Sequence, residues 1–275
     1  MYERILWMSD LSERSDACLD VVRAFGSIRG AQVTLAHATG AALQGATPTP
    51  ADEPRTQHEA ELIERARDHL GACKKHLEEH GMSVEVAVFV GQADEVCSAL
   101  ASSHDIDLVI VGETGVSGID RLLLGDTSSR ILRASPAPVL VRKGPIGQLE
   151  KLLCPVVSTS WVSNAGAAHA MRLAQTTGAE LVFLEVVPTG EADVTGTHVR
   201  LAQHVLSELG RPLPQGWQVQ VHQADSPAEG IVAHGKDADC VIMSSAERRG
   251  LERLLVGSVT EEVLRTCPVP VLVAR

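Results

Sequence analysis

The chain has 275 residues, of which 44% are hydrophobic and 21% charged, a globular balance that excludes wholesale disorder. Three Trp, three Phe and one Tyr are its only aromatic residues, so the core must be aliphatic and a stacking surface for single-stranded nucleic acid is excluded. The formal net charge of −11 argues against general attraction to nucleic acid or to an anionic membrane.

Short β-branched runs predict buried strands in the first half of the chain. In chain order these strands are Ile5–Met8, Gln32–Ala36, Val84–Phe89, Leu108–Val111 and Val139–Val141. Apolar residues with helical spacing separate the runs, most clearly at Leu62, Ala66, Leu70, Cys73 and Leu77. Strands that alternate with helices predict an α/β fold, an open parallel five-stranded sheet with helices on both faces.

The second half of the chain repeats the first. Three segments recur at one constant offset of 132 residues: Asp105–Val111 as Asp237–Met243, Arg121–Gly125 as Arg253–Gly257, and Pro136–Val141 as Pro268–Val273. We therefore predict two domains in tandem, 1–143 and 150–275, joined by a linker at 144–149. The first domain carries an insertion, Thr39–Thr56, that we expect to be a surface loop.

The chain shows no sign of a membrane or secretory segment. No apolar run approaches the roughly 18 residues of a membrane span, and charge appears too early for a signal peptide. Six cysteines occur singly, without a C-x-x-C pair. We expect reduced thiols in a cytoplasmic protein.

In an open α/β sheet, ligands bind at the carboxyl ends of the strands, near the point where the strand order reverses. Asp10 follows the first strand, and Gly112 and Gly115 follow the fourth. We expect these glycines to adopt positive φ angles, and Gly125 to lead into a helix start that favours phosphate. No Walker A motif and no G-x-G-x-x-G motif after the first strand is present, so the common P-loop and Rossmann sites are excluded.

The spacing Gly112-x2-Gly115-x9-Gly125, with the hydroxyl residues after it and the strand Pro136–Val141, resembles the ATP-binding signature of the universal stress protein (UspA) family. With its repeat, the chain resembles the tandem members of that family. The resemblance implies a 3-2-1-4-5 strand order and an adenine nucleotide, ATP, ADP or AMP, with Mg²⁺ as a possible companion. It implies that Asp10 contacts ribose and that the Ala38 backbone lies by adenine. The residues that it implies for the phosphates are Gly112, Gly115, Gly125, Asp126, Thr127 and Ser128.

The two halves depart from this signature in different ways. Asp126 stands where the family has Ser and would repel phosphate, unless neighbouring hydroxyls compensate or it simply caps the helix. The second half has Val156-Val157-Ser158 after its first strand, and it has Ser244 and Glu247 in place of two glycines. It keeps Gly257, Ser258, Val259 and Thr260, a weaker second site, although we favour a capping box from Ser258 to Glu261. The N-terminal domain is therefore predicted to be the better nucleotide site.

One helix of the first half carries a stripe of possible metal ligands. His69, Cys73, His76 and His80 line one side of it. The stripe borders the apolar face, so we interpret these residues as the edge of the core and expect no metal site. The paired acids Asp105/Asp107 and Asp237/Asp239 are interpreted as turn chemistry before a strand.

The sequence favours a regulatory nucleotide-binding protein that responds to stress. No general base stands beside the phosphate loop, so we name no catalytic residue and expect at most slow ATP hydrolysis. Two alternatives stay open, a nucleotide-free interaction scaffold and an adenylyl-transferring enzyme. We expect a homodimer, or a pseudo-dimer within the chain, through strands Val139–Val141 and Val271–Val273.

Overall fold

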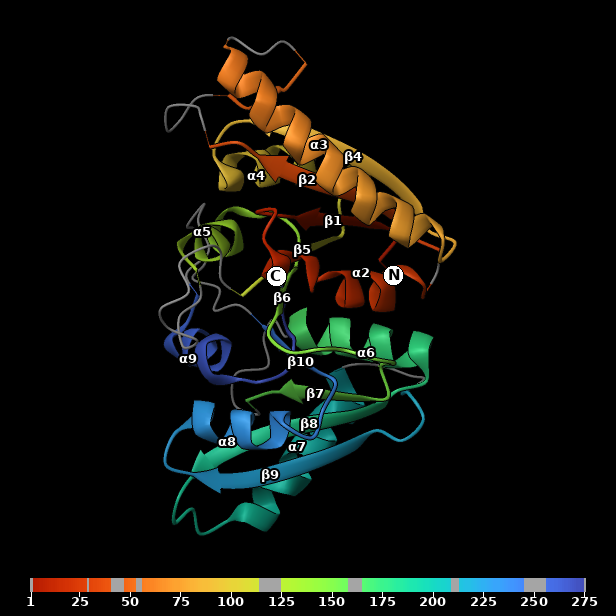
Figure 1. Cartoon of the computed structure of the whole chain (residues 1–275). Coiled ribbons are helices and arrows are strands. Elements are labelled where there is room, and N and C mark those ends of the chain that lie inside the picture. The colour runs from red at the N-terminus through yellow and green to blue at the C-terminus, as the bar shows by residue number, and fades with distance from the viewer. Residues whose placement is uncertain are drawn as a thin grey trace. The chain divides into compact units, whose positions relative to one another are not determined.

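The computed structural model describes residues 2–28, 30–40, 47–52, 56–113, 125–157, 165–208, 213–244 and 256–274. Gly115 and Glu247, two positions of the predicted glycine pattern, lie outside these ranges. The chain divides into two compact units, Tyr2–Arg142 and Lys143–Arg275 (Figure 1). Among the described helices, none is long and apolar enough to span a bilayer.

The first unit is built on a sheet of six strands. They are β1 Arg4–Met8, β2 Gln32–Ala38, β3 Thr49–Pro50, β4 Ser83–Val90, β5 Leu108–Gly112 and β6 Val139–Arg142. Their order is β3-β4-β2-β1-β5-β6, and all neighbours are parallel except β3 and β4. The five parallel strands thus have the predicted 3-2-1-4-5 order. The short strand β3 lies in the insertion that we expected to be entirely loop, so that expectation was wrong for Thr49 and Pro50.

Helices cover both faces of this first sheet. They are α1 Glu13–Asp16, α2 Leu19–Gly26, α3 Gln57–Glu78, α4 Ala93–Ser103 and α5 Asp126–Ala134. Helix α2 packs beside α3 on one face, and α4 packs beside α5 on the other (Figure 1). The predicted two-faced α/β architecture is confirmed.

The buried stripe of α3 is shifted from its predicted position at the beginning of the helix. Its core residues are Ile63, Ala66, Leu70, Cys73 and Leu77. Leu62 is 36% exposed, so Ile63 takes the place that the spacing had given to Leu62. Neighbouring helix positions are about 100° apart around the axis, and only packing decides which of two adjacent apolar residues faces the sheet.

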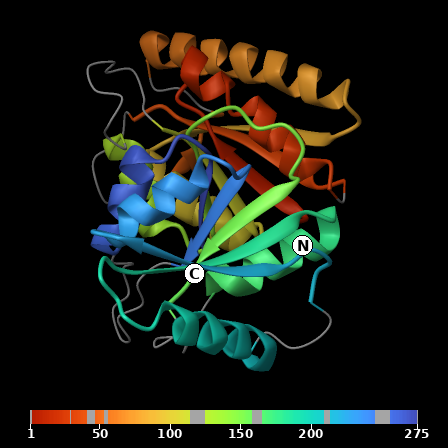
Figure 2. The same cartoon turned by 90° about the horizontal axis from the view of Figure 1, so that it is seen from below.

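The second unit repeats this plan. Its strands are β7 Lys151–Pro155, β8 Glu180–Pro188, β9 Gln218–Ala224, β10 Cys240–Ser244 and β11 Val271–Ala274. All neighbours are parallel in the order β11-β10-β7-β8-β9, again 3-2-1-4-5. Its helices are α6 Ala165–Thr177, α7 Val194–Glu208, α8 Pro227–Gly235 and α9 Ser258–Thr266. Helices α8 and α9 pack together on one face of this sheet, and α6 and α7 lie on the other (Figure 2).

A repeated aspartate fixes the start of the first strand in each unit. Asp107 accepts hydrogen bonds from the amides of Glu3 (2.8 Å) and Arg4 (3.2 Å). Asp239 accepts two bonds of the same kind, 2.8 and 2.7 Å long, from amides at the start of β7. The predicted structural role is seen for Asp107 and Asp239, but the expected local turn chemistry was wrong for them, because each carboxylate binds amides of a distant segment, 104 and 89 residues away in the chain.

Changing Arg142 to Ala is expected to lower the free energy of unfolding by about 1–2 kcal/mol, because it removes a two-point ion pair from a largely buried carboxylate. Arg142, at the end of β6, pairs with Asp20 of α2 through Nε–Oδ1 (3.3 Å) and Nη2–Oδ2 (3.0 Å). Each side chain is about one-fifth exposed. Urea unfolding measures the loss, and the Arg142→Lys variant, which keeps the charge, should lose less. Equal stability of all three proteins would show that the pair contributes nothing.

Candidate functional site

The predicted ligand residues of the first unit follow strands that are neighbours in its sheet. Strand β1 lies between β2 and β5, with Met8 paired to Ala36 on one side and to Val111 on the other. Asp10, Ala38 and Gly112 therefore come together at one carboxyl edge, where the strand order reverses. The fold places the candidate site where open α/β sheets bind ligands.

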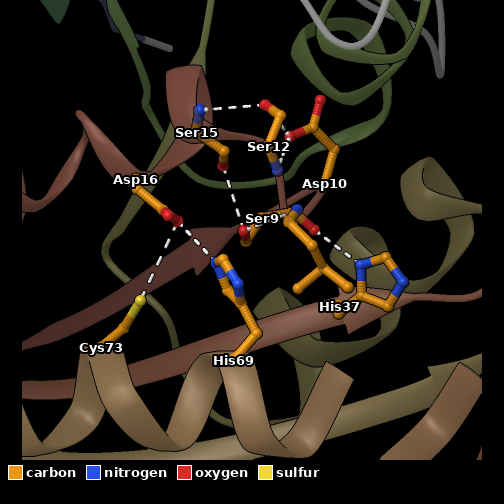
Figure 3. Close-up of polar contacts among 9 residues, drawn as sticks. Ser9, Asp10, Ser12, Ser15, Asp16, His37, His69 and Cys73 are labelled. Atoms are coloured by element: carbon orange, nitrogen blue, oxygen red, sulfur yellow. Dashed lines mark hydrogen bonds and ion pairs between the residues drawn. The ribbon is translucent and has the colours of Figure 1, made fainter. Parts of the chain in front are cut away.

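Asp10 is an exposed carboxylate on a loop that its own hydrogen bonds organise. Its Oδ1 accepts from the Ser12 amide (3.0 Å) and the Ser12 hydroxyl (2.6 Å). Ser12 Oγ in turn accepts from the Ser15 amide (3.1 Å) and caps α1 (Figure 3). Within the described ranges Asp10 Oδ2 has no hydrogen bond, so it remains available to a ligand hydroxyl.

The residue after Asp10 has a strained backbone. Leu11 has φ 63°, in the left-handed region that side chains other than glycine rarely adopt. The Leu11 amide donates to Ser9 Oγ at 3.0 Å, which helps to hold this conformation. A conformation of this kind costs of order 1–3 kcal/mol and is concentrated at binding and active sites. No sequence signal marks Leu11, because a turn of this kind is ordinarily made with Gly or Asn.

His37 adds a residue to this edge that sequence reasoning left without a role. Its Nδ1 is 2.9 Å from the carbonyl oxygen of buried Ser9. A carbonyl only accepts, so Nδ1 carries the proton and Nε2 of the neutral ring is an acceptor. Burial lowers the pKa of His37, which favours this neutral form. In the sequence, the feature that could have identified His37 was its position near the carboxyl end of a predicted strand, now β2.

The β5–α5 segment presents a helix start without a side-chain cap. Ser128 Oγ donates to the Gly112 carbonyl at 2.8 Å, which ties the first turn of α5 to the end of β5. Gly125 is the N-cap residue, and its amide donates to Glu113 O at 2.9 Å. Asp126 and Thr127 are exposed in the first turn. The interpretation of Asp126 as the helix cap is therefore wrong, and the first amides of α5 face no capping side chain among the described residues.

Gly112 does not have the backbone conformation that we predicted for it. The φ angle of Gly112 is not positive. A Cβ atom added to Gly112 would have Cys18 Sγ and Ser15 Cα as its nearest neighbours, both at 3.8 Å, which is an ordinary contact distance. Neither strain nor crowding by the described residues requires glycine there. A ligand that passes close to the backbone remains a reason for it.

The corresponding edge of the second unit is arranged differently. Val157, 55% exposed, follows β7 where Asp10 follows β1, so the carboxylate is missing. Ser244, at the end of β10, uses its Oγ to accept from the Gly166 amide of α6 (2.9 Å). At the phosphate end, Gly257 is the N-cap of α9 without a side-chain bond, and Ser258 is the first helical residue. The predicted Ser258–Glu261 capping box is therefore wrong, although Thr260 is buried as a structural role would require.

The cysteines do not provide a nucleophile. All six are free and buried. Burial raises the pKa of Cys18 to about 12 and that of Cys73 to about 11, with the Asp16 carboxylate adding to the effect at Cys73. Without a bound metal ion, both thiols are therefore protonated near neutral pH, and neither is expected to act as a nucleophile.

Comparison with known proteins identifies the family to which this fold belongs. The model of the universal stress protein family matches residues 1–143 and 150–275. A universal stress protein of Mycolicibacterium smegmatis is 27% identical over 97% of this chain and 95% of its own length.

Two solved structures illustrate how far the likeness extends. A universal stress protein of Archaeoglobus fulgidus is 22% identical and covers 100% of this chain and 99% of its own, with a TM-score of 0.76, which shows the shared fold. A universal stress protein solved in complex with cAMP is 22% identical and covers 51% of this chain and 95% of its own. Its TM-score is 0.37. The resemblance stated from the motifs is confirmed: the chain belongs to the universal stress protein family and carries two of its domains in tandem.

Proposed function

We propose that the first unit binds ATP or another adenine nucleotide at the carboxyl edge of β1, β2 and β5, and that the protein is regulatory. One observation carries the proposal: an exposed, hydrogen-bond-organised Asp10 stands at the same edge as the uncapped start of α5. A carboxylate that accepts from ribose hydroxyls and free amides that bind phosphate are the two groups a nucleotide needs.

The chain's residues fit such a ligand. Asp10 Oδ2 would accept from ribose, and the Ala38 backbone, at the end of β2, would lie by adenine. The phosphate residues that we propose are Gly112, Gly115, Gly125, Asp126, Thr127 and Ser128. Ser128 supports the role because its bond to the Gly112 carbonyl fixes the first turn of α5 against β5. Any Mg²⁺ would accompany a triphosphate and is not required by the geometry.

We propose that the second unit is the weaker site. Val157 supplies no ribose acceptor, and the Ser244 hydroxyl is engaged with the Gly166 amide. The start of α9, with Gly257, Ser258, Val259 and Thr260, retains only the phosphate end of the pattern. Binding there would lack the groups that position the nucleoside.

Catalysis, location and assembly are proposed on similar grounds. All six cysteine thiols are buried and His37 is held by Ser9, so we propose no reaction faster than slow ATP hydrolysis. Six free cysteines fit a cytoplasmic protein. Strands β6 and β11, each last in the strand order of its own unit, are the proposed pairing strands of a dimer or pseudo-dimer.

Changing Asp10 to Asn is expected to weaken ATP binding about tenfold, because a hydrogen bond to a charged acceptor contributes about 1.5 kcal/mol or more. The amide oxygen of Asn can still accept from Ser12, so the loop should keep its shape. Isothermal titration of ATP into the full chain measures the change in affinity.

Val157→Ala is the matched control, because Val157 occupies the place of Asp10 in the second unit and should leave the affinity unchanged. Mass spectrometry of nucleotide released from protein purified without added ATP supplies an independent test. Unchanged affinity in Asp10→Asn would contradict the assigned role of Asp10. No released nucleotide and a silent titration would favour the scaffold, and release of pyrophosphate from ATP would favour an adenylyl-transferring enzyme.

A further inference from the structure

Three metal-ligating side chains of the first unit converge beside α1. Asp16, the last residue of α1, faces His69 and Cys73, which are four residues apart on α3 and so share one side of that helix. His69 Nε2 lies 2.8 Å from Asp16 Oδ1, and Cys73 Sγ lies 3.9 Å from the same oxygen. All three ligand atoms lie within 4.8 Å of one another. Figure 3 shows the two side chains of α3 directed at the Asp16 carboxylate.

The separations between these atoms suit a tetrahedral ion. Zinc bonds of about 2.0–2.3 Å place neighbouring ligand atoms roughly 3.3–3.8 Å apart. The distances from Asp16 to His69 and Cys73, 2.8 and 3.9 Å, lie on either side of that range, and the separation of His69 and Cys73 is at most 4.8 Å, so small side-chain shifts would form the site. A hydrogen bond from the Cys73 thiol to Asp16 would be weak, because S–H is a poor donor. Hydrogen bonding alone therefore gives little reason for a cysteine at this position.

Exposure of the three residues allows an ion to enter. The Asp16 and His69 side chains are 31% and 32% exposed, whereas Cys73 is 7% exposed. The sulfur is therefore buried, while the two partly exposed side chains give water and ions access to the cluster. Imidazole and thiolate together favour zinc over magnesium or calcium, and three protein ligands with one open position form a common zinc arrangement.

We propose that Asp16, His69 and Cys73 bind a Zn²⁺ ion, with water as the fourth ligand. The helical spacing of His69 and Cys73 had suggested only the edge of the core. Asp16 is 53 residues earlier in the chain, and only the packing of α1 near α3 supplies this third ligand. The ion would connect α1, which follows the Asp10 loop directly, to α3.

Cobalt titration of the full chain, stripped of metal and kept reduced, tests the proposal. Co²⁺ bound to a thiolate gives a charge-transfer band in the near ultraviolet, and tetrahedral Co²⁺ absorbs strongly in the visible. We expect both features to appear with one equivalent of Co²⁺ and to disappear when Zn²⁺ is added. Cys73→Ser should abolish the charge-transfer band, and Asp16→Asn and His69→Gln should each weaken Co²⁺ binding at least about tenfold.

Two other histidines of this region provide a matched control. His76, in α3, and His80, in the turn after it, are also four residues apart, are exposed, and can bind metal as a surface pair; His80 therefore does not belong to the predicted helical stripe. The double variant His76→Gln/His80→Gln should retain the cobalt spectrum. Circular dichroism of each metal-free variant establishes that it is folded, and His69→Gln, at a half-exposed position, serves if Cys73→Ser does not fold.

Three outcomes would overturn the proposal. They are a folded wild-type protein without the charge-transfer band, a band that survives in Cys73→Ser, and loss of binding in the His76/His80 double variant with retention in His69→Gln. The last would assign the ion to the exposed histidine pair. No nucleotide is present in the assay, so its result is independent of the proposed ATP site.

Discussion

Changing Asp126 to Asn is expected to tighten ATP binding about tenfold, because two unit charges about 4 Å apart repel by roughly 1–4 kcal/mol, depending on the local dielectric. Asp126 is the first residue of α5 and its side chain is exposed, so it lies at the helix start where we place the phosphates. The gain should be largest for ATP, smaller for AMP and absent for adenosine. Isothermal titration with the three ligands measures this series.

Glu64→Gln is the control for the change in net charge. Glu64 is an exposed carboxylate on α3, outside the proposed site, and its neutralisation should leave all three affinities unchanged. Weaker ATP binding by Asp126→Asn would contradict the repulsion, and would point instead to a carboxylate that assists an accompanying Mg²⁺. An equal gain for adenosine would place the effect on the nucleoside and not on the phosphates.

Changing Gly166 to Ala is expected to destabilise the second unit by about 3 kcal/mol, the upper part of the range for overpacking a tight contact. A Cβ on Gly166 would lie 2.8 Å from the Ser244 amide nitrogen and 2.9 Å from the Met243 carbonyl carbon. Both are backbone atoms at the end of β10, so α6 or the strand would have to move. Urea unfolding of the full chain should show a lower midpoint for the transition of this unit.

Gly71→Ala is the matched control, because both glycines lie within helices. A Cβ on Gly71, in α3, would meet nothing within 4 Å. This change should stabilise the protein by about 0.5–1 kcal/mol, the usual advantage of Ala over Gly in a helix. If Gly166→Ala were also stabilising, the close approach of α6 to β10 would be wrong, together with the reason given for the altered site in the second unit.

The two units illustrate how a repeated fold can lose one site and keep its scaffold. Asp107 and Asp239 accept hydrogen bonds from equivalent backbone amides. Each carboxylate fixes the start of the first strand of its unit, and the stability of both units depends on that contact. Asp10 has no counterpart, and Val157 stands in its place. Ser244 holds the α6 backbone where the first unit has Gly112, which makes only ordinary contacts with Cys18 and Ser15.

Local chemistry explains how much of the fold the sequence predicted. Buried parallel strands are continuous aliphatic runs, so their positions in the first half could be read directly, and the constant offset of the repeat carried the assignment to β10 and β11. For the buried face of α3, the sequence predicted Leu62 as the first core residue, whereas the structure buries its neighbour Ile63. The periodicity could not separate them, because two adjacent apolar residues both fit it. The resemblance named the family, and it brought Asp10, Ala38 and Gly112 into one hypothesis.

What the sequence by itself determined is therefore the α/β class, the duplication and the edge of the sheet where a ligand would bind. Strand and helix patterns are local, the repeat is found by comparing one segment with another, and the ligand edge follows from the fold class. Only the tertiary structure decided the strained Leu11, the tautomer of His37, the uncapped start of α5 and the meeting of Asp16 with His69 and Cys73. These features depend on contacts between distant segments or on a single backbone angle. Neither leaves a periodic trace in the sequence, because packing fixes them after the local elements have formed.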